Sequence, residues 1–219
     1  TMPENGHWSI GNSTIFIGRE DGVNEAGLAV GMSSVRPVGF KPGINWFMAI
    51  RAVLDRCPNV AEAVKFLSNL RYSTGSNYLL VDESGDMAVV EASPQKVRVR
   101  KPEQGFLVAT NHFIHDEMRD VENEKERPPD SVERYTTIHK ALQQRKGKID
   151  AKTAQKILAD HTGYVCSHVD AIQLGTLWSL VAALKKLNIL VAEGHPCRTR
   201  YKVDTRLNKA IQMRRKRGD

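Results

Sequence analysis

Cysteine is scarce in this sequence, and the chain contains no long hydrophobic run. Among its 219 residues there are three cysteines, Cys57, Cys166 and Cys197. An odd number leaves at least one thiol unpaired, which argues against a disulfide-stapled secreted domain and indicates a reducing compartment. We therefore expect a cytoplasmic protein.

Signals for membranes and export are also missing. No apolar run approaches the roughly 20 residues that a membrane-spanning helix needs. The opening residues 1–6 have neither the basic nor the apolar region of a signal peptide. Because Met2 follows Thr1, the first residue is expected to be a processed end, a cloning scar or a fragment boundary. We expect no membrane partner.

Acidic residues are outnumbered by basic ones, and the formal net charge is +7. The basic residues gather in four runs, at residues 96–101, 145–148, 185–186 and 214–217. Such runs can form a nucleic-acid footprint, but no aromatic residues interleave with them as a single-strand platform requires. We interpret them as solvated faces, and a nucleic-acid partner is not expected.

Hydrophobic periodicity and turn signals predict the order of elements. Pro58 ends a first helix after Cys57, and Asn59 with Glu62 and Asp130 with Glu133 are capping patterns that begin later helices. We predict strands at 13–18 and 28–35, helices at 47–57 and from 59, strands at 77–82, 87–92, 97–100 and 105–113, helices from 130 and 150, and strands at 175–184 and 187–192. Residues 203–217 fit either an amphipathic helix or a disordered tail.

Short turns between neighbouring strands, with helices in pairs, favour an α+β fold. Two antiparallel sheets packed on each other with helix pairs outside accommodate this order better than a doubly wound parallel sheet does. The predicted strand 105–113 organises the site, because a hydrophobic run there ends in Thr110, Asn111 and His112. A buried strand can present an amide donor and an imidazole in this way.

Several stretches resemble one family in the same order along the chain. Residues 21–30 resemble the D-G-x-N-E-x-G-L hairpin of choloylglycine hydrolases and penicillin V acylases. Residues 109–113 resemble the T-N-H segment of the related acyl-CoA:6-aminopenicillanate acyltransferases, and residues 131–135 resemble their helix with a required arginine. Their final hairpin is similar to three further stretches, 166–168, 175–179 and 194–197.

The resemblance implies an N-terminal-nucleophile hydrolase fold, the αββα sandwich, over residues 1–202, with a basic tail or helix at 203–219. It implies hydrolysis of linear carbon–nitrogen amide bonds in a small-molecule acyl amide, with no cofactor. Acyl transfer of the 6-aminopenicillanate type is the alternative, because the same acyl-enzyme can react with an amine instead of water. Assembly into a homo-oligomer is left open.

The resemblance also implies roles for individual residues. Asn111 matches the asparagine that donates to the oxyanion, and Arg134 matches the arginine held near the nucleophile. Ser34 falls where members carry a second polar residue, asparagine or tyrosine. His112 is expected to position its neighbours, and Asn24 to set the hairpin turn, with substrate contact secondary.

The nucleophile is where the sequence departs from the family. Members begin with a cysteine several tens of residues before the hairpin, whereas none of the first 23 residues here is cysteine. Cys57, Cys166 and Cys197 match other positions of the family. Thr1 is a candidate, since N-terminal threonine serves in other branches of the fold, but it aligns with a connection between strands. We therefore expect the nucleophile to lie outside this chain, which leaves open whether the chain alone is an enzyme.

A second group of residues consists of zinc-ligand types. His161, Cys166 and His168 form a His-x4-Cys-x-His pattern, and His195 with Cys197 forms a His-x-Cys pattern. The spacing fits no standard zinc pattern, and the resemblance accounts for these residues without metal, so no metal site is expected. A noncatalytic basic or zinc-binding protein on the same fold is the alternative from another functional class.

Overall fold

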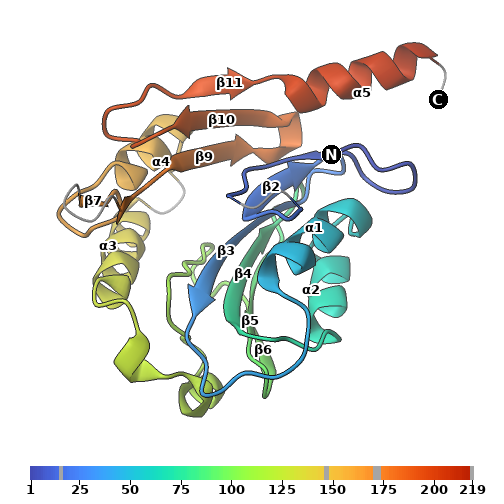
Figure 1. Ribbon diagram of the computed structural model, residues 1–219. Helices are drawn as coiled ribbons and strands as arrows, with labels where there is room; N and C mark the ends of the chain where they lie inside the picture. Colours follow the sequence, from blue (N-terminus) through green and yellow to red (C-terminus); the bar gives the residue numbers. More distant parts are fainter. Residues whose placement is uncertain (15–16, 146–147, 170–173, 218–219) are drawn as a thin grey trace.

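The computed structural model describes residues 1–14, 17–145, 148–169 and 174–217 of the chain. Two antiparallel sheets form its framework (Figure 1). In the larger sheet the six strands follow one another in chain order, and each pairs with the next. They are β1 (Ser9–Ile10), β2 (Asp21–Asn24), β3 (Ala29–Val35), β4 (Gly75–Val81), β5 (Met87–Ala92) and β6 (Val97–Arg100).

Two helices, α1 (Trp46–Arg56) and α2 (Val60–Ser68), cover one face of this sheet (Figure 1). The sequence predicted both boundaries between them. Cys57 is the C-cap of α1, immediately before Pro58. The Asn59 side chain accepts a hydrogen bond from the Glu62 backbone N–H at 3.0 Å, as an N-cap residue should.

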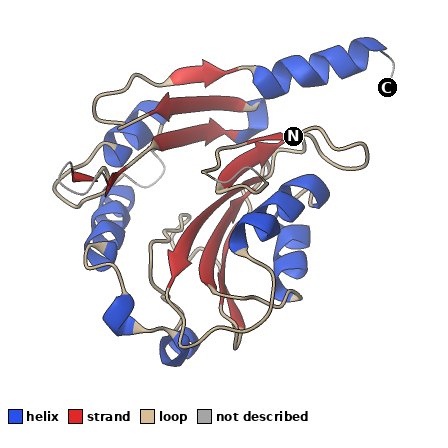
Figure 2. Ribbon diagram, in the orientation of Figure 1, coloured by secondary structure: helices blue, strands red, loops and turns tan. Residues whose placement is uncertain are grey.

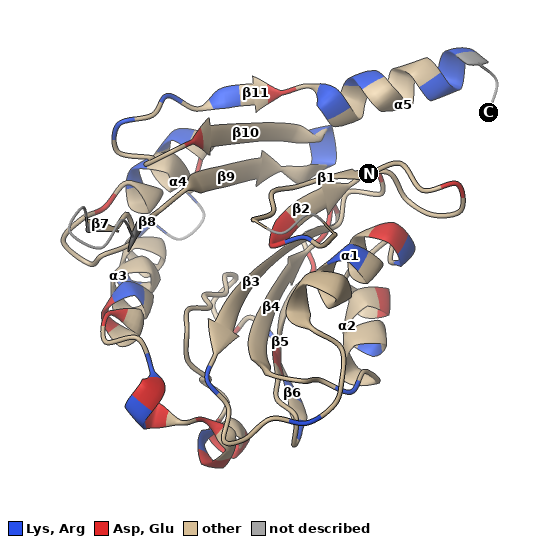
Figure 3. Ribbon diagram, viewed as in Figure 1, with Lys and Arg blue, Asp and Glu red and all other residues tan. Residues whose placement is uncertain are grey.

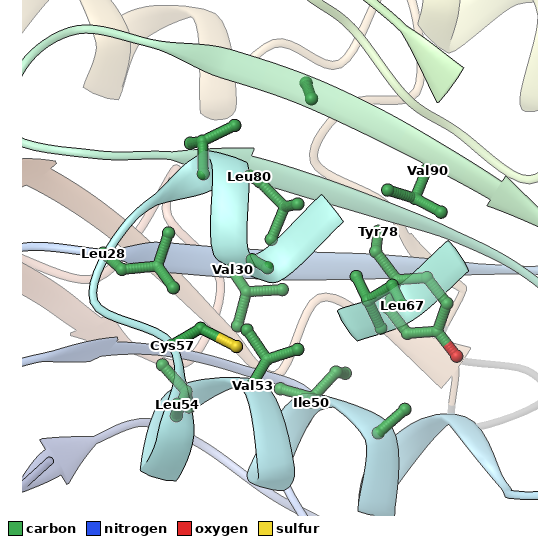
Figure 4. Packing of buried hydrophobic residues seen from close by; sticks show 14 of the residues in the cluster. Leu28, Val30, Ile50, Val53, Leu54, Cys57, Leu67, Tyr78, Leu80 and Val90 are labelled. Atoms are coloured by element: carbon green, nitrogen blue, oxygen red, sulfur yellow. The ribbon is translucent and has the colours of Figure 1, made fainter. Parts of the chain in front are cut away.

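The main hydrophobic core lies between these helices and the sheet (Figure 4). Ile50 and Leu54 of α1 and Leu67 of α2 are fully buried against Tyr78 and Leu80 of β4. The helical spacing of Ile50 and Leu54 and the alternation along β4 therefore bring the apolar faces of both element types together. The sheet's opposite face remains available for polar side chains.

The smaller sheet packs near the β1–β2 end of the larger one, and helices lie at the periphery (Figure 2). A buried cluster joins the two sheets and the C-terminal helix: Val23 comes from the larger sheet, Ile189 from the smaller sheet and Leu207 from the helix. The Trp178 indole N–H also donates to the half-buried carboxylate of Asp21 at 2.6 Å. The elements of this half are α3 (Ser131–Gln144), α4 (Ala151–Leu158), β7 (His168–Val169), β8 (Leu174–Gly175), β9 (Trp178–Ala183), β10 (Asn188–Glu193), β11 (Lys202–Asp204) and α5 (Arg206–Arg217). The smaller sheet has the order β11–β10–β9, and β7 and β8 form a separate two-stranded pair.

The α+β class and the two antiparallel sheets are thus as predicted, but the first predicted strand is wrong. The described residues of 13–18 form turn and loop, and residues 15–16 lie outside the described part. The Thr14 N–H donates to Glu20, and the Asn12 N–H donates to Asp21. These carboxylates take the backbone donors, so the described residues before Asp21 in this stretch join no strand, and β2 begins at Asp21.

The predicted strand at 105–113 is also wrong. This segment contains only an isolated bridge between Thr110 and His112 and begins in a bend at Gly105. Its backbone groups bond to side chains instead; for example, the carbonyl of Val108 accepts from the Arg100 guanidinium at 2.9 Å. The meander therefore has three strands, β4 to β6, and the segment crosses the face of the sheet that α1 and α2 leave open.

Basic residues are spread along α5 (Figure 3). Arg214 lies over the Trp8 ring, 4.4 Å from its centroid, and forms an ion pair with Glu25. These contacts hold α5 against the N-terminal part of the chain. Within the described ranges, no helix combines the length and apolar character needed to span a bilayer.

Candidate functional site

Asn111 lies between two other residues that the sequence singled out. Its side-chain Nδ2 donates to the backbone carbonyl of Ser34 at 2.9 Å and lies 3.5 Å from the Ser34 hydroxyl. Its Oδ1 accepts a hydrogen bond from Nη2 of Arg134 at 2.9 Å. An amide nitrogen carries two hydrogens. The Ser34 carbonyl accepts one of them, and the contact of the other with the Ser34 hydroxyl is long, at 3.5 Å.

Arg134 fixes which way the Asn111 amide faces. A guanidinium can only donate, so its contact requires the amide oxygen on that side and directs the nitrogen toward Ser34. Arg134 is itself held by Asp130, whose carboxylate accepts from Nε at 2.7 Å. Asp130 thus occupies the N-cap position of α3 without a side-chain cap bond, contrary to the capping role predicted for it.

Three residues facing Asn111 from the sheet were not predicted as site residues. Ser33, Asn77 and Glu91 are direct partners across β3, β4 and β5, and they form what we call the polar row. The Asn77 amide donates to the carbonyls of Thr110 at 2.8 Å and His112 at 2.9 Å. These carbonyls lie on either side of Asn111, so the polar row holds the backbone from which Asn111 projects.

The polar row also fixes the residues that follow. Glu91 is fully buried and accepts hydrogen bonds from the backbone N–H groups of Ile114 and His115. Its charge is balanced by Arg100, at 2.5 Å. The sequence contains one signal that could have identified Glu91 as a site residue, namely a carboxylate inside the apolar run Met87–Ala92. A charge in such a strand is almost never buried without a partner.

His112 points away from Asn111 and into the protein. Its ring Nδ1 lies 2.8 Å from the Ser131 hydroxyl and 3.1 Å from the Thr110 hydroxyl, and the ring packs edge-on against Tyr135. Burial, reinforced by nearby arginines, lowers the pKa of His112 to about 4. The imidazole is therefore neutral at pH 7, and its contacts join the 110–112 backbone to the start of α3.

Asn24 lies at the other end of β3 from Ser34 and is fully buried. Its Oδ1 accepts from the backbone N–H of Ala26 and Leu28, and its Nδ2 donates to the carbonyls of Leu54 and Cys57. These bonds use both functional atoms of the amide. The structure therefore gives Asn24 a part in the hairpin turn and places it apart from Asn111.

In the described part of the chain, none of the candidate nucleophiles lies beside Asn111. Cys57 is buried at the α1–α2 junction, where burial raises the pKa of its thiol to about 11. The Thr1 amine donates to the Ser9 carbonyl at 2.6 Å, beside β1. Because Ser9 pairs with Asn24, Thr1 lies toward the Asn24 end of the hairpin.

An open cavity of about 590 Å³ adjoins the other side of the 105–115 segment. Arg100 of β6, Phe106 and Val108 line it together with Tyr135 and His139 of α3. Ser34, Asn111 and Arg134 are not among its lining residues. The segment therefore separates two surfaces, one with the Asn111 amide and one with a partly aromatic cavity.

The residues of zinc-ligand type also come together. One ligand atom from each of His161, Cys166, His168 and Cys197 lies within 4.8 Å of the others. His195 packs against this group, with its ring centroid 4.8 Å from that of His168. This cluster lies on the β7–β10 side of the chain and shares no residue with the Asn111 group.

Comparison with known proteins places this geometry in context. The family model described as acyl-coenzyme A:6-aminopenicillanic acid acyl-transferase matches residues 1–198. No curated protein matches the sequence. Among solved structures, a mutant of conjugated bile acid hydrolase from Clostridium perfringens is similar with a TM-score of 0.62 and 17% identity, covering 90% of this chain and 80% of that one.

Two further solved structures share the fold. Penicillin V acylase from Agrobacterium tumefaciens has a TM-score of 0.53 at 23% identity, over 80% of this chain and 63% of that one. The N-acylethanolamine-hydrolyzing acid amidase ortholog of Caenorhabditis elegans has a TM-score of 0.51 at 15% identity, over 88% of this chain and 81% of that one. At these identities the structures support the arrangement of sheets and helices.

Proposed function

This chain belongs to the acyl-coenzyme A:6-aminopenicillanic acid acyl-transferase family, and we propose that it serves an enzyme that hydrolyses linear carbon–nitrogen amide bonds through an acyl-enzyme. The Asn111 amide, oriented by Arg134, carries the proposal. Amide hydrolysis passes through a tetrahedral intermediate whose oxygen is negatively charged. Donors that are already oriented toward this oxygen lower the barrier without reorganising during the reaction.

In this proposal the second N–H of Asn111 exchanges its long contact with the Ser34 hydroxyl for the oxyanion, while the first N–H stays on the Ser34 carbonyl. Arg134 acts as a positioning residue, because its donor fixes the amide orientation. It also adds positive charge next to the developing negative charge. Removing a single oxyanion donor lowers kcat by about 10²–10³-fold in comparable sites.

We further propose that the nucleophile is a thiolate from outside these 219 residues. Two observations support this. Cys57, Cys166 and Cys197 lie away from Asn111, at the α1–α2 junction and in the histidine–cysteine cluster. Beyond Gly31, β3 has no strand partner on its β2 side in the described ranges, so its backbone there can pair with a further segment.

Acyl transfer is the second candidate function. Its support is the description of the matching family, which names an acyl-transferase. Hydrolysis and transfer share every step up to the acyl-enzyme and differ only in whether water or an amine attacks it. The proportion of the two products is therefore the quantity that distinguishes them.

The test uses protein expressed from the whole reading frame, analysed first by intact mass and N-terminal sequencing. A longer chain or a companion fragment with an N-terminal cysteine is expected. Hydrolysis is then measured on conjugated bile acids, penicillin V and N-acylethanolamines, with and without an added amine acceptor. The amine product, relative to free acid, reports the transfer reaction.

Two variants and a control make the test specific. Asn111→Ala is expected to lower kcat by about 10²–10³-fold. Asn69→Ala changes an exposed asparagine at the end of α2 and should leave kcat unchanged. Equal kcat in Asn111→Ala and the wild type would remove the oxyanion role. Absence of turnover on all three substrate classes, with an N-terminal cysteine present, would refute the amidohydrolase proposal itself.

A further inference from the structure

Two histidine and two cysteine side chains, all of metal-ligand type, converge where α4, β7 and the loop after β10 meet. His161 follows α4, Cys166 precedes β7, His168 lies in β7, and Cys197 follows β10. One ligand atom from each lies within 4.8 Å of the other three. Among these atoms, Cys197 Sγ and His168 Nε2 lie 3.8 Å apart.

We propose that these four residues bind one Zn²⁺ ion in a tetrahedral Cys2His2 site. Zinc–sulfur bonds of about 2.3 Å and zinc–nitrogen bonds of about 2.0–2.1 Å place tetrahedral ligand atoms about 3.3–3.8 Å apart. The cluster therefore needs each pair of ligand atoms to approach by at most about 1.5 Å. Two thiolates and two neutral imidazoles leave the bound site without net charge, which suits partial burial.

The backbone around the ligands is fixed by local contacts. The carbonyl of Asp160 accepts the Cys166 N–H at 2.7 Å, and its carboxylate accepts the Gly163 N–H at 2.7 Å. Gly163 also approaches Thr137 of α3 so closely that a Cβ there would lie 2.0 Å from the Thr137 hydroxyl oxygen. The loop from His161 to Cys166 thus has a defined shape that returns Cys166 toward His161.

His195 supports the cluster without being one of its four members. Its Nδ1 lies 2.9 Å from the Thr176 carbonyl, an acceptor, so this nitrogen carries the hydrogen. Its ring lies against that of His168 and over Gly175, where a Cβ would come within 2.7 Å of the ring. His195 and Gly175 therefore restrict the position of the His168 imidazole, as outer-shell residues do in metal sites.

The surroundings also favour a metal crosslink. No residue of α4 is fully buried, so apolar packing alone stabilises this part of the chain weakly. An ion bound by residues following α4, in β7 and following β10 would join three segments, and its binding free energy would add to folding stability. His161 is exposed while Cys166 is buried, which gives an ion a path from solvent.

A disulfide between the two cysteines of the cluster would compete with zinc binding. Cys166 and Cys197 are near each other, and an oxidant that takes up two electrons and two protons would convert their thiols into a disulfide. A disulfide would use both sulfur ligands and abolish the zinc site. The zinc proposal therefore requires both thiols to be reduced in the native protein. It is independent of the proposed amide hydrolysis.

The experiment uses the full chain with a histidine-free affinity tag, purified without chelators. Zinc is measured by inductively coupled plasma mass spectrometry, and thiol state by intact mass. We expect one zinc ion per chain in the wild type and in Cys57→Ala, a matched cysteine control. We expect loss of stoichiometric zinc in Cys197→Ser and in His161→Ala, whose exposed position makes misfolding no explanation for the loss.

Cobalt replacement supplies a second readout. Co²⁺ in a tetrahedral site with two thiolates gives intense visible d–d bands and a thiolate charge-transfer band, and both should weaken in Cys197→Ser. Zinc chelation should lower the Tm of the wild type and Cys57→Ala but not of His161→Ala. Zinc far below one per chain, the same zinc content in all variants, or a Cys166–Cys197 disulfide in freshly purified protein would each overturn the proposal.

Discussion

Asn77 and Glu91 lie opposite each other in register on β4 and β5, and both side chains are fully buried. Asn77 donates to the carbonyls on either side of Asn111, while Glu91 accepts from the N–H groups of Ile114 and His115. A donor and an acceptor side by side on the sheet therefore match the backbone groups of a segment that forms no strand. The proposed oxyanion donor is positioned by this match.

Asn77→Asp tests the donor half of the arrangement. The substitution keeps the shape of the side chain but places a carboxylate against two carbonyl oxygens, so both hydrogen bonds are lost. Leaving buried groups unsatisfied costs about 1–3 kcal/mol, and more when a group is charged. We expect urea unfolding to show at least this loss of stability. Asn188→Asp, at an exposed position in β10, is the control, and an equal effect there would contradict the prediction.

Glu91→Gln tests the acceptor half. It removes the charge that balances Arg100, whose side chain is only 12% exposed. Breaking a buried ion pair by changing one partner destabilises proteins by about 3–5 kcal/mol. We expect a loss of this size in denaturant unfolding. Glu117→Gln, which removes a solvent-exposed ion pair with Arg98, should change stability little; similar losses in the two variants would rule out a special role for Glu91.

Arg134→Lys separates orientation from charge. Lysine keeps the positive charge but lacks the planar fork that reaches Asp130 and Asn111 at once. We expect kcat to fall at least about tenfold, while stability changes by about 1 kcal/mol or less because the Asp130 pair is partly exposed. Steady-state kinetics with thermal unfolding on the same samples gives both quantities. Full activity in Arg134→Lys would show that charge, and not orientation, is what matters.

His112 makes stability depend on pH in a defined direction. Its pKa is lowered to about 4 in the folded protein, against about 6.5 in an unfolded chain. Between these values the unfolded chain binds more protons, so stability falls as the pH drops from about 6.5 toward 4. The loss of folding stability amounts to at most about 3.4 kcal/mol.

Urea unfolding at a series of pH values between 4 and 7.5 measures this slope. His112→Gln should reduce the dependence of stability on pH, because the titrating imidazole is removed. The glutamine amide can still form a hydrogen bond with Ser131. His7→Gln is the control and should leave the slope as in the wild type. A wild-type stability that does not change over this range would disprove the assignment.

The parts of the fold set by local rules could be predicted from sequence. The α1–α2 junction follows from Pro58 and Asn59, and the strands β4 to β6 from alternation and turns. The 105–113 segment was misassigned because an apolar run looks like a strand in the sequence. The run does not show whether its backbone groups will bond to a neighbouring strand or to side chains. Only the fold reveals that Asn77, Glu91 and Arg100 take those bonds.

The candidate site shows the same division. The resemblance selected Ser34, Asn111 and Arg134, and the structure brings these three together, while their catalytic roles stay a prediction. The resemblance did not select Asn77, because its hydrogen-bond partners lie more than 30 residues away in the chain and cannot be identified from the sequence. The residues of the histidine–cysteine cluster were noted by type, but no metal site was expected because their spacing fits no standard pattern; the fold brings Cys197 to the other three from beyond β10.

The chain-order arrangement of the larger sheet has a kinetic consequence. Each of β1 to β6 pairs with its sequence neighbour, and the longest insertion, between β3 and β4, itself contains α1 and α2. Contacts between near neighbours close small loops, which gives a low contact order and fast folding. We therefore expect residues 9–100 to form a folding nucleus onto which the 105–115 segment and the smaller sheet assemble later. In a nascent chain emerging from the ribosome, the polar row would then form before the segment that carries Asn111 has been docked onto it.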